Sequence, residues 1–179
     1  MRGLIIGMYA LLSAGTSQAE RVSEPYTKVG DWDISKDSGA CVMSRSYLLK
    51  DEGDEQELAV IYDAQREAAA LGWATRKPKF PPLSASLDFR LSFTGKGSSL
   101  NERWGNQTFG IQKRADGYRF MHVFRGPTES DRFLRDVASS DTVGLWFGPS
   151  LMMGLPLSAS DAVTKLRECS SNIVEATPR

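Results

Sequence analysis

The sequence predicts a mainly β protein: a single-domain antiparallel β-sandwich or flattened barrel, with a short helix and a C-terminal helix packed on it. Three observations support this fold class. Apolar and polar residues alternate along several short segments that turn-forming residues separate. Helical periodicity is confined to two stretches in the last third of the chain. About 160 residues follow a predicted leader, which suits one domain with a core rather than two.

The first 19 residues have the three parts of a secretory signal peptide. Arg2 supplies the basic start, an apolar run covers residues 4–14, and small residues precede an expected cleavage after Ala19. The run is about 11 residues long, whereas a membrane-spanning helix needs about 20. A buried first strand or a retained anchor is the alternative. We expect cleavage, a mature domain of residues 20–179, and a periplasmic or secreted location.

Charge composition argues against a nucleic-acid or anionic-membrane partner. The chain has 22 Lys and Arg against 22 Asp and Glu, and loss of Arg2 with the leader leaves a net charge of −1. Both kinds of partner require a clustered basic excess. The most apolar window of the mature chain, residues 142–157, contains three glycines and two prolines. We therefore expect no integral membrane segment after cleavage.

The two cysteines, Cys41 and Cys169, predict one disulfide, because an exported protein meets an oxidising compartment. The alternative is a nucleophilic cysteine served by His122, the one histidine of the chain. One histidine and two cysteines without C-x-x-C spacing make an incomplete zinc site. We expect no catalytic residue, no metal and no cofactor, and we expect His122 to be a packed strand residue.

The strands are predicted in order from alternation and turn residues. We expect a first strand over residues 26–34 with Trp32 and Ile34 on one face, a turn at 37–39, and a second strand over 40–49. The acidic segment 51–57 is expected to be a solvated loop. Further strands are expected over 58–62, 67–75, 86–93, 109–114, 118–124 and 142–147; residues 67–75 are also compatible with a helix.

Two helices are predicted from capping signals and periodicity. Thr128 and Asp131 are spaced as in a capping box and are expected to begin a short helix that ends near residue 140. The segment 158–161 repeats the signal and opens the last helix. Its apolar stripe consists of Ala159, Ala162, Val163, Leu166 and Cys169. Cys169 therefore faces the domain, where Cys41 can meet it. The tail from residue 173 is expected to be loose.

Three sequence features resemble the invasion-associated locus B family, exported proteins of alphaproteobacteria. They are the segment Gly30-Asp31-Trp32-Asp33-Ile34, the early Cys41, and Leu155-Pro156-Leu157-Ser158 followed by a helix with Ala162, Leu166 and Cys169. The proline-rich segment 77–82 and the stretch 146–153 depart from the family pattern. The resemblance implies a non-catalytic envelope or secreted protein, linked in pathogenic members to host-cell invasion. It transfers no catalytic residue.

We therefore expect a non-enzymatic exported protein that acts on a protein partner through its surface. The expected interaction surface comprises Trp146, Phe147, Met152 and Met153. One alternative is a small envelope inhibitor or accessory protein that binds another enzyme with the loop 95–99 or 51–57. A third hypothesis is a hydrolase that uses Asp31 and Asp33, although a solvated face explains this pair more simply.

Overall fold

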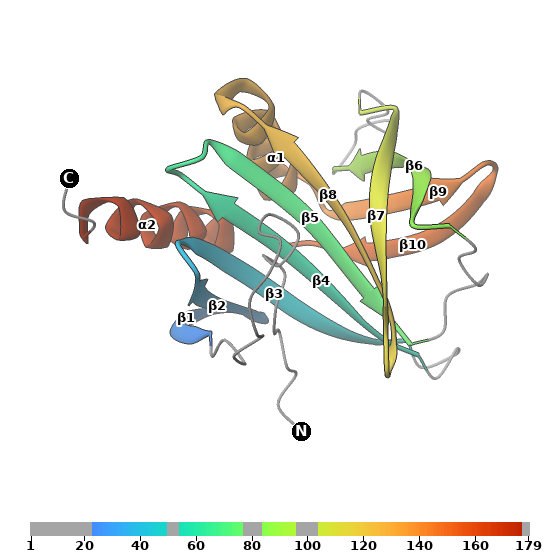
Figure 1. Cartoon of the computed structure of the whole chain (residues 1–179), viewed down its shortest axis with the longest axis horizontal. Coiled ribbons are helices and arrows are strands. Elements are labelled where there is room, and N and C mark those ends of the chain that lie inside the picture. The colour runs from blue at the N-terminus through green and yellow to red at the C-terminus, as the bar shows by residue number, and fades with distance from the viewer. Residues whose placement is uncertain (1–22, 50–53, 77–83, 96–103, 177–179) are drawn as a thin grey trace.

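In a computed structural model, residues 23–49, 54–76, 84–95 and 104–176 are described. They form ten strands and two helices (Figure 1). The elements are β1 (Glu24–Val29), β2 (Trp32–Asp37), β3 (Ala40–Leu49), β4 (Asp54–Asp63), β5 (Ala68–Thr75), β6 (Ser86–Thr94), β7 (Asn106–Arg114), β8 (Gly117–Arg125), α1 (Pro127–Ser139), β9 (Thr142–Phe147), β10 (Ser150–Pro156) and α2 (Ser160–Ala176). The predicted leader lies outside the described residues.

All ten strands belong to one antiparallel sheet with the order β1-β2-β3-β4-β5-β8-β7-β6-β9-β10. The prediction of a mainly β antiparallel fold with two helices, the last one packed on the sheet, is confirmed. The sheet bends until β10 approaches β2 and β3 without pairing with them. Trp32 Nε1 donates to the Leu157 carbonyl at 3.1 Å, and Tyr47 Oη donates to the Pro156 carbonyl at 2.6 Å. Side chains therefore join the two ends of an open sheet.

The core lies on the inner face of this bent sheet, where both helices also pack. α2 contacts β1 to β4, and α1 contacts β5 and β8 (Figure 1). An aromatic cluster fills the centre: Trp73 stacks on Phe120 with ring centroids 4.6 Å apart, and Phe124 stacks on Phe133 of α1 at 4.2 Å. The outer face carries a second, smaller cluster of mostly small side chains: Ala40, Val42, Ala59, Ile61 and Ala70.

The predicted first strand is wrong in its extent, because it is a hairpin. Gly30 has φ 56° and, with Asp31, forms the turn between β1 and β2. Only glycine adopts this backbone conformation without a steric cost, so the chain reverses at that point. The predicted inner face is confirmed: Trp32 and Ile34 are buried, and β2 pairs with β3 across the expected turn.

The acidic segment is a loop only in part. β4 begins at Asp54, which is buried instead of solvated. Its carboxylate accepts hydrogen bonds from Thr75 Oγ1 at 2.6 Å, Gln56 Nε2 at 3.1 Å and the Arg76 amide at 3.2 Å. A buried carboxylate is tolerated when such donors replace water. The expectation of a solvated loop through residue 57 is therefore wrong for residues 54–57, and residues 51–53 lie outside the described part.

Residues 68–75 form strand β5, as predicted for the ambiguous segment. Each of its residues is in register with β4 on one side and with β8 on the other. A central strand satisfies its backbone groups on both edges, and this outweighs the helix propensity of Ala68-Ala69-Ala70.

Both helices occur where they were predicted, but their ends differ. α1 begins with Pro127, and its N-cap is Gly126, which has no side chain to cap the helix, so the expected capping by Thr128 is wrong. Proline suits the first helical position because its missing N–H would be unpaired there anyway. The expected stripe of α2 is buried as predicted. The helix continues to Ala176, so the loose tail predicted from residue 173 is wrong for residues 173–176, and residues 177–179 lie outside the described part.

Strand β10 was not predicted from the sequence. It pairs with β9 through a tight turn at Gly148, with a register shift between Leu151 and Met153. Glycines and prolines interrupt the alternation in this stretch, and the bulge breaks the two-residue period. β10 is an end strand of the sheet, a position that tolerates such interruptions.

Candidate functional site

The predicted disulfide is present. Cys41 on β3 and Cys169 on α2 are bonded, their Cα atoms are 6.0 Å apart, and both residues are fully buried. The bond joins the C-terminal helix to the strand on which it packs. No described cysteine is free. Neither sulfur is therefore a thiol nucleophile in this state.

His122 is a packed residue of β8, as expected. Its Nδ1 lies 2.9 Å from the Thr108 carbonyl, and its ring contacts Phe124 and Phe109 with centroids 4.6 and 5.5 Å away. A carbonyl only accepts, so Nδ1 bears the proton in this hydrogen bond. The contact holds the imidazole between aromatic rings.

The proposed hydrolase pair does not share a site. Asp31 bonds Arg45 at 2.8 Å, whereas Asp33 bonds Lys28 at 3.1 Å. About seven-tenths of each aspartate side chain is exposed. Two carboxyl groups that act together on one substrate must face the same site, and these two are directed to different basic side chains.

The predicted interaction surface is divided by the structure. Met152 and Met153 are buried in the core, with 5% and 2% of their surface exposed, so they cannot belong to an exposed patch. Phe147 is 44% exposed, Trp146 is half-buried, and Leu151 beside them is 39% exposed. We call Trp146, Phe147 and Leu151 the hairpin patch. Leu151 was missed because the bulge at Met152 obscures which residues of β10 face outward.

The hairpin patch has apolar side chains on both faces of the β9–β10 hairpin. Trp146 and Leu151 pair across the strands on one face and lie over Gly144, where a Cβ atom would come 3.1 Å from Trp146 Nε1 and 3.4 Å from Leu151 Cδ1. Trp146 donates to Ser92 Oγ at 3.0 Å, which fixes the indole. Phe147, next along the strand, contacts Phe89 with centroids 6.2 Å apart. Because Gly144 has no side chain, Trp146 and Leu151 can pack directly over the backbone at that position.

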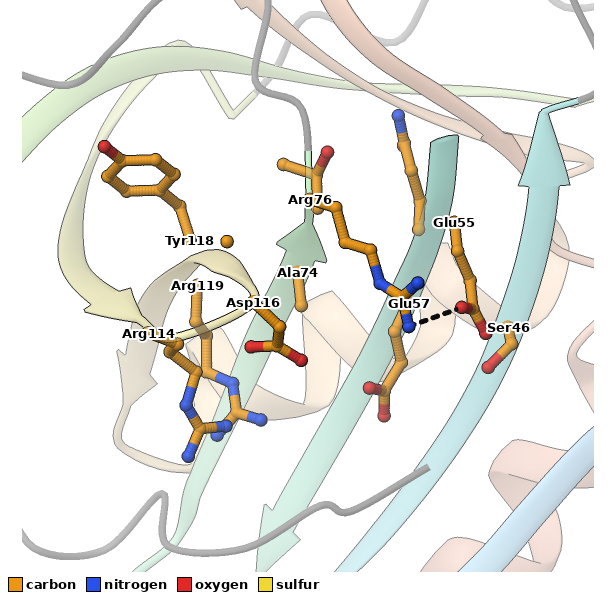
Figure 2. Close-up of a pocket in the computed structure, with 12 residues that line it drawn as sticks. Ser46, Glu55, Glu57, Ala74, Arg76, Arg114, Asp116, Tyr118 and Arg119 are labelled. Carbon is orange, nitrogen blue, oxygen red and sulfur yellow. Dashed lines mark ion pairs between the residues drawn. The ribbon is translucent and has the colours of Figure 1, made fainter. Parts of the chain in front are cut away.

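A second candidate site is a pocket of about 130 Å³ that lies where β4 begins, β5 ends and the β7–β8 hairpin turns (Figure 2). Six charged residues line it: Glu55 and Glu57 of β4, Arg76 after β5, and Arg114, Asp116 and Arg119 of the β7–β8 hairpin. The turn of that hairpin approaches β5 closely, because a Cβ atom on Gly117 would overlap the Thr75 carbonyl. The sequence predicted the turn but not its neighbour, which is remote along the chain.

Burial shifts the pKa values of two charged residues of this pocket, Glu57 and Arg119. Arg76 bonds Glu55 at 2.9 Å on the rim, with both side chains at least half exposed (Figure 2). Burial raises the pKa of Glu57, and the positive charges of Arg119 and Arg114 partly oppose that rise. Burial likewise lowers the pKa of Arg119 from its ordinary value, and the nearby Arg114 charge lowers it further. The pocket thus keeps ionisable groups in a partly dry environment.

Among the described residues, no group of three or more His, Cys, Asp or Glu side chains is arranged to hold a metal ion. None of the helices in the described ranges is long and apolar enough to cross a membrane. The loop 96–99, part of one predicted inhibitory segment, lies outside those ranges. No family model, curated protein or solved structure matches the chain. The resemblance to the invasion-associated locus B family stays a prediction.

Proposed function

We propose that this chain is an exported, non-enzymatic protein of the bacterial cell envelope that binds a protein partner through the hairpin patch. The observation that supports it most directly is the exposure of Phe147 and Leu151 at one hairpin. Four large apolar side chains of the described residues are strongly exposed, and these two are among them. Clustered exposed apolar side chains are typical of interaction sites, whereas isolated ones are common on any surface.

The partner is expected to offer an apolar groove that receives the β9–β10 hairpin as a wedge. Leu151 with Trp146 would contact one wall of the groove, and Phe147 would contact the other. Arg90 lies over the Trp146 ring at 5.3 Å, so an acidic rim on the first wall would complement the charge there. Simple strand addition to the β10 edge is disfavoured, because the bulge between Leu151 and Met153 twists that edge.

Export is supported by the buried disulfide together with the signal-like N-terminus. A disulfide persists in the periplasm or outside the cell, and the cytoplasm of most bacteria keeps thiols reduced. The family resemblance agrees with an envelope location. N-terminal sequencing of protein from the periplasmic fraction should begin at Glu20, and intact mass under non-reducing conditions should be two hydrogens below that of the reduced chain. Retention of residues 1–19 with two free thiols would contradict export.

A second candidate function is a small inhibitor or accessory protein of another envelope enzyme. The wedge shape of the hairpin favours it, because a hairpin that is apolar on both faces suits a cleft better than a flat surface. Both candidates use the same residues and differ only in whether the partner is an enzyme. The carboxylate pair of the hydrolase hypothesis has no support, since Asp31 and Asp33 form ion pairs with different basic side chains at the surface.

The test places a photo-crosslinking amino acid at position 147 or 151 of the full precursor in the native cell. Position 174 is the control, because Val174 on α2 is 41% exposed, close to the 39% of Leu151. We expect positions 147 and 151 to give an adduct with the same protein, and position 174 to give none. An unlabelled mature Phe147→Ser/Leu151→Ser competitor should leave the adduct yield unchanged, whereas the unlabelled wild-type domain should reduce it.

Equal adducts at all three positions, or none at 147 and 151, would refute the hairpin patch as the binding surface. The identity of the cross-linked protein separates the two candidate functions. If it is an enzyme, its activity should fall when the mature domain is added. Turnover of a small substrate by the purified domain itself would overturn the non-enzymatic proposal.

A further inference from the structure

Arg119 is the most unusual side chain of the charged pocket. It lies on β8 with 7% of its surface exposed, and its Nη1 has no hydrogen-bond partner in the described structure. A guanidinium keeps its charge in proteins and has five N–H donors to satisfy. Buried donors without partners are rare, and each calls for an explanation such as a missing ligand.

Arg114 adds a second positive charge to this part of the pocket. It belongs to the same β7–β8 hairpin, and its guanidinium lies beside that of Arg119 (Figure 2). Two like charges at close range repel each other, more strongly where water is partly excluded. An anion that accepts from both side chains would remove the repulsion and satisfy Arg119 Nη1.

The pocket favours an anion of one charge over one of two. Three arginines on its lining face three carboxylates, and the Arg76–Glu55 ion pair already neutralises one of each. Glu57 and Asp116 remain near the two hairpin arginines, so a phosphate dianion would meet more repulsion than a carboxylate. A planar carboxylate also matches the fork of a guanidinium. The volume of about 130 Å³ admits a carboxylate and a few attached carbons.

We infer that this pocket is a carboxylate-binding site, in which Arg119 and Arg114 together hold a single carboxylate group. The group belongs either to a small free acid or to the end of a peptide chain, since both present the same chemistry. The site is separate from the hairpin patch: the β7–β8 turn is at the foot of the sheet in Figure 1, whereas β9 and β10 meet at its right edge. The inference therefore does not rest on the proposed function.

The test is a titration of the mature, disulfide-bonded domain followed by NMR of the arginine side-chain resonances. The probes are acetate, the tripeptide Ala-Ala-Ala with a free carboxyl end, the same tripeptide amidated, and inorganic phosphate. We expect saturable shifts of the Arg119 signals with the two carboxylates and none with the amide. Acetate alone binding well indicates a free acid, and tighter binding of the free tripeptide indicates a peptide end.

Two variants locate the site. Arg119→Met keeps an unbranched apolar stem and removes the charged head group. We expect carboxylate affinity to fall at least about tenfold, since a charge-assisted hydrogen bond is lost. The thermal midpoint should rise or stay level, because a buried donor without a hydrogen-bond partner is gone. Arg125→Met is the matched control: Arg125 lies on the same strand and face but is exposed and outside the pocket. The carboxylate affinity of the Arg125→Met variant should equal that of the wild type. If Arg119→Met does not fold, Arg114→Met should show the weakened binding.

Several results would overturn the inference. They are no saturable shift with any carboxylate, equal binding of the amidated tripeptide, tighter binding of phosphate than of both carboxylates, or an unchanged affinity in Arg119→Met. A large drop in the thermal midpoint of Arg119→Met with unchanged carboxylate affinity would assign the arginine a purely structural role.

Discussion

The indole N–H of Trp32 donates to the backbone carbonyl of Leu157 at 3.1 Å, in the buried interior, across 125 positions of the chain. Trp32 begins β2, and Leu157 follows β10, the end strand of the sheet. This contact and the neighbouring bond from Tyr47 hold the curvature of a sheet that does not close by backbone pairing. Burial raises the pKa of Tyr47 to about 12, so its hydroxyl remains a donor throughout the physiological range.

Trp32→Phe should lower the free energy of unfolding by about 1–3 kcal/mol, because it leaves the buried Leu157 carbonyl short of a donor. Arg45 also donates to this carbonyl at 3.4 Å, which limits the loss. Urea unfolding measures the effect. Trp146→Phe is the matched control, since it removes an indole hydrogen bond from a half-buried residue. A larger loss for Trp146→Phe would contradict the buried role of Trp32.

Removal of the disulfide by Cys41→Ala/Cys169→Ala should cost about 4 kcal/mol of stability. The bridge spans 128 positions, and the entropy that it removes from the unfolded chain grows with the logarithm of the loop length. Equilibrium unfolding of the variant and the oxidised wild type measures the difference. Because both sulfurs are buried, the folded protein should react with glutathione only as fast as it opens. Rapid reduction without unfolding would show that the bond is accessible.

Asp54→Asn should destabilise the fold by about 2 kcal/mol. The amide nitrogen of asparagine would face one of the donors from Thr75, Gln56 or the Arg76 backbone, so a buried hydrogen bond is lost. Glu55→Gln at the next position is the control. It breaks an exposed ion pair with Arg76, so its effect should stay within about 0.5 kcal/mol. Similar values for the two variants would mean that Asp54 is solvated after all.

Glu57 should make the protein less stable as the pH rises. Burial raises its pKa in the folded state, so the folded protein binds that proton more tightly than the unfolded chain. Stability from this group is therefore greatest below the usual glutamate pKa and declines as the pH increases through the raised value. Glu57→Gln should remove the decline, and its advantage over wild type should grow from about pH 4 to pH 7. Urea unfolding across this range, with Glu55→Gln as the control, measures it; a constant difference would contradict the assignment.

The two sides of β10 should respond differently to truncation. Met153→Ala should cost about 3 kcal/mol, because Met153 is a core residue. Leu151→Ala should change stability by less than about 1 kcal/mol, since its side chain is 39% exposed. Thermal and urea unfolding compare them. Equal losses would place Leu151 in the core and remove it from the hairpin patch.

Several elements could be predicted because their signals are local. The alternation of Leu87, Phe89, Leu91 and Phe93 indicated a strand, and the stripe that ends at Cys169 indicated a helix with one buried face. The disulfide followed from two cysteines and a leader-like N-terminus. Errors occurred where tertiary contacts outweigh a local pattern. The donors of Thr75 and Arg76 stabilise the buried carboxylate of Asp54, and neither residue is near it in sequence.

The candidate sites show the same division. Trp146 and Phe147 were predicted as exposed, but the bulge in β10 buries Met152 and Met153 and exposes Leu151 instead. The charged pocket had no sequence signal, because Arg119, Glu57 and Arg76 meet only when β4, β5 and β8 lie side by side. Spacing within one strand shows which face a side chain takes, and it does not show which strand will lie beside it.

The sequence by itself determined the mainly β class, the C-terminal helix and the cysteine pair, since these depend on periodicity and composition over short windows. Tertiary structure alone decided the strand order, the bending of the sheet onto Leu157, and the gathering of charged side chains around Arg119. The physical reason is that burial is a property of the assembled sheet: the same carboxylate or guanidinium is solvated on a free strand and desolvated once its neighbours arrive.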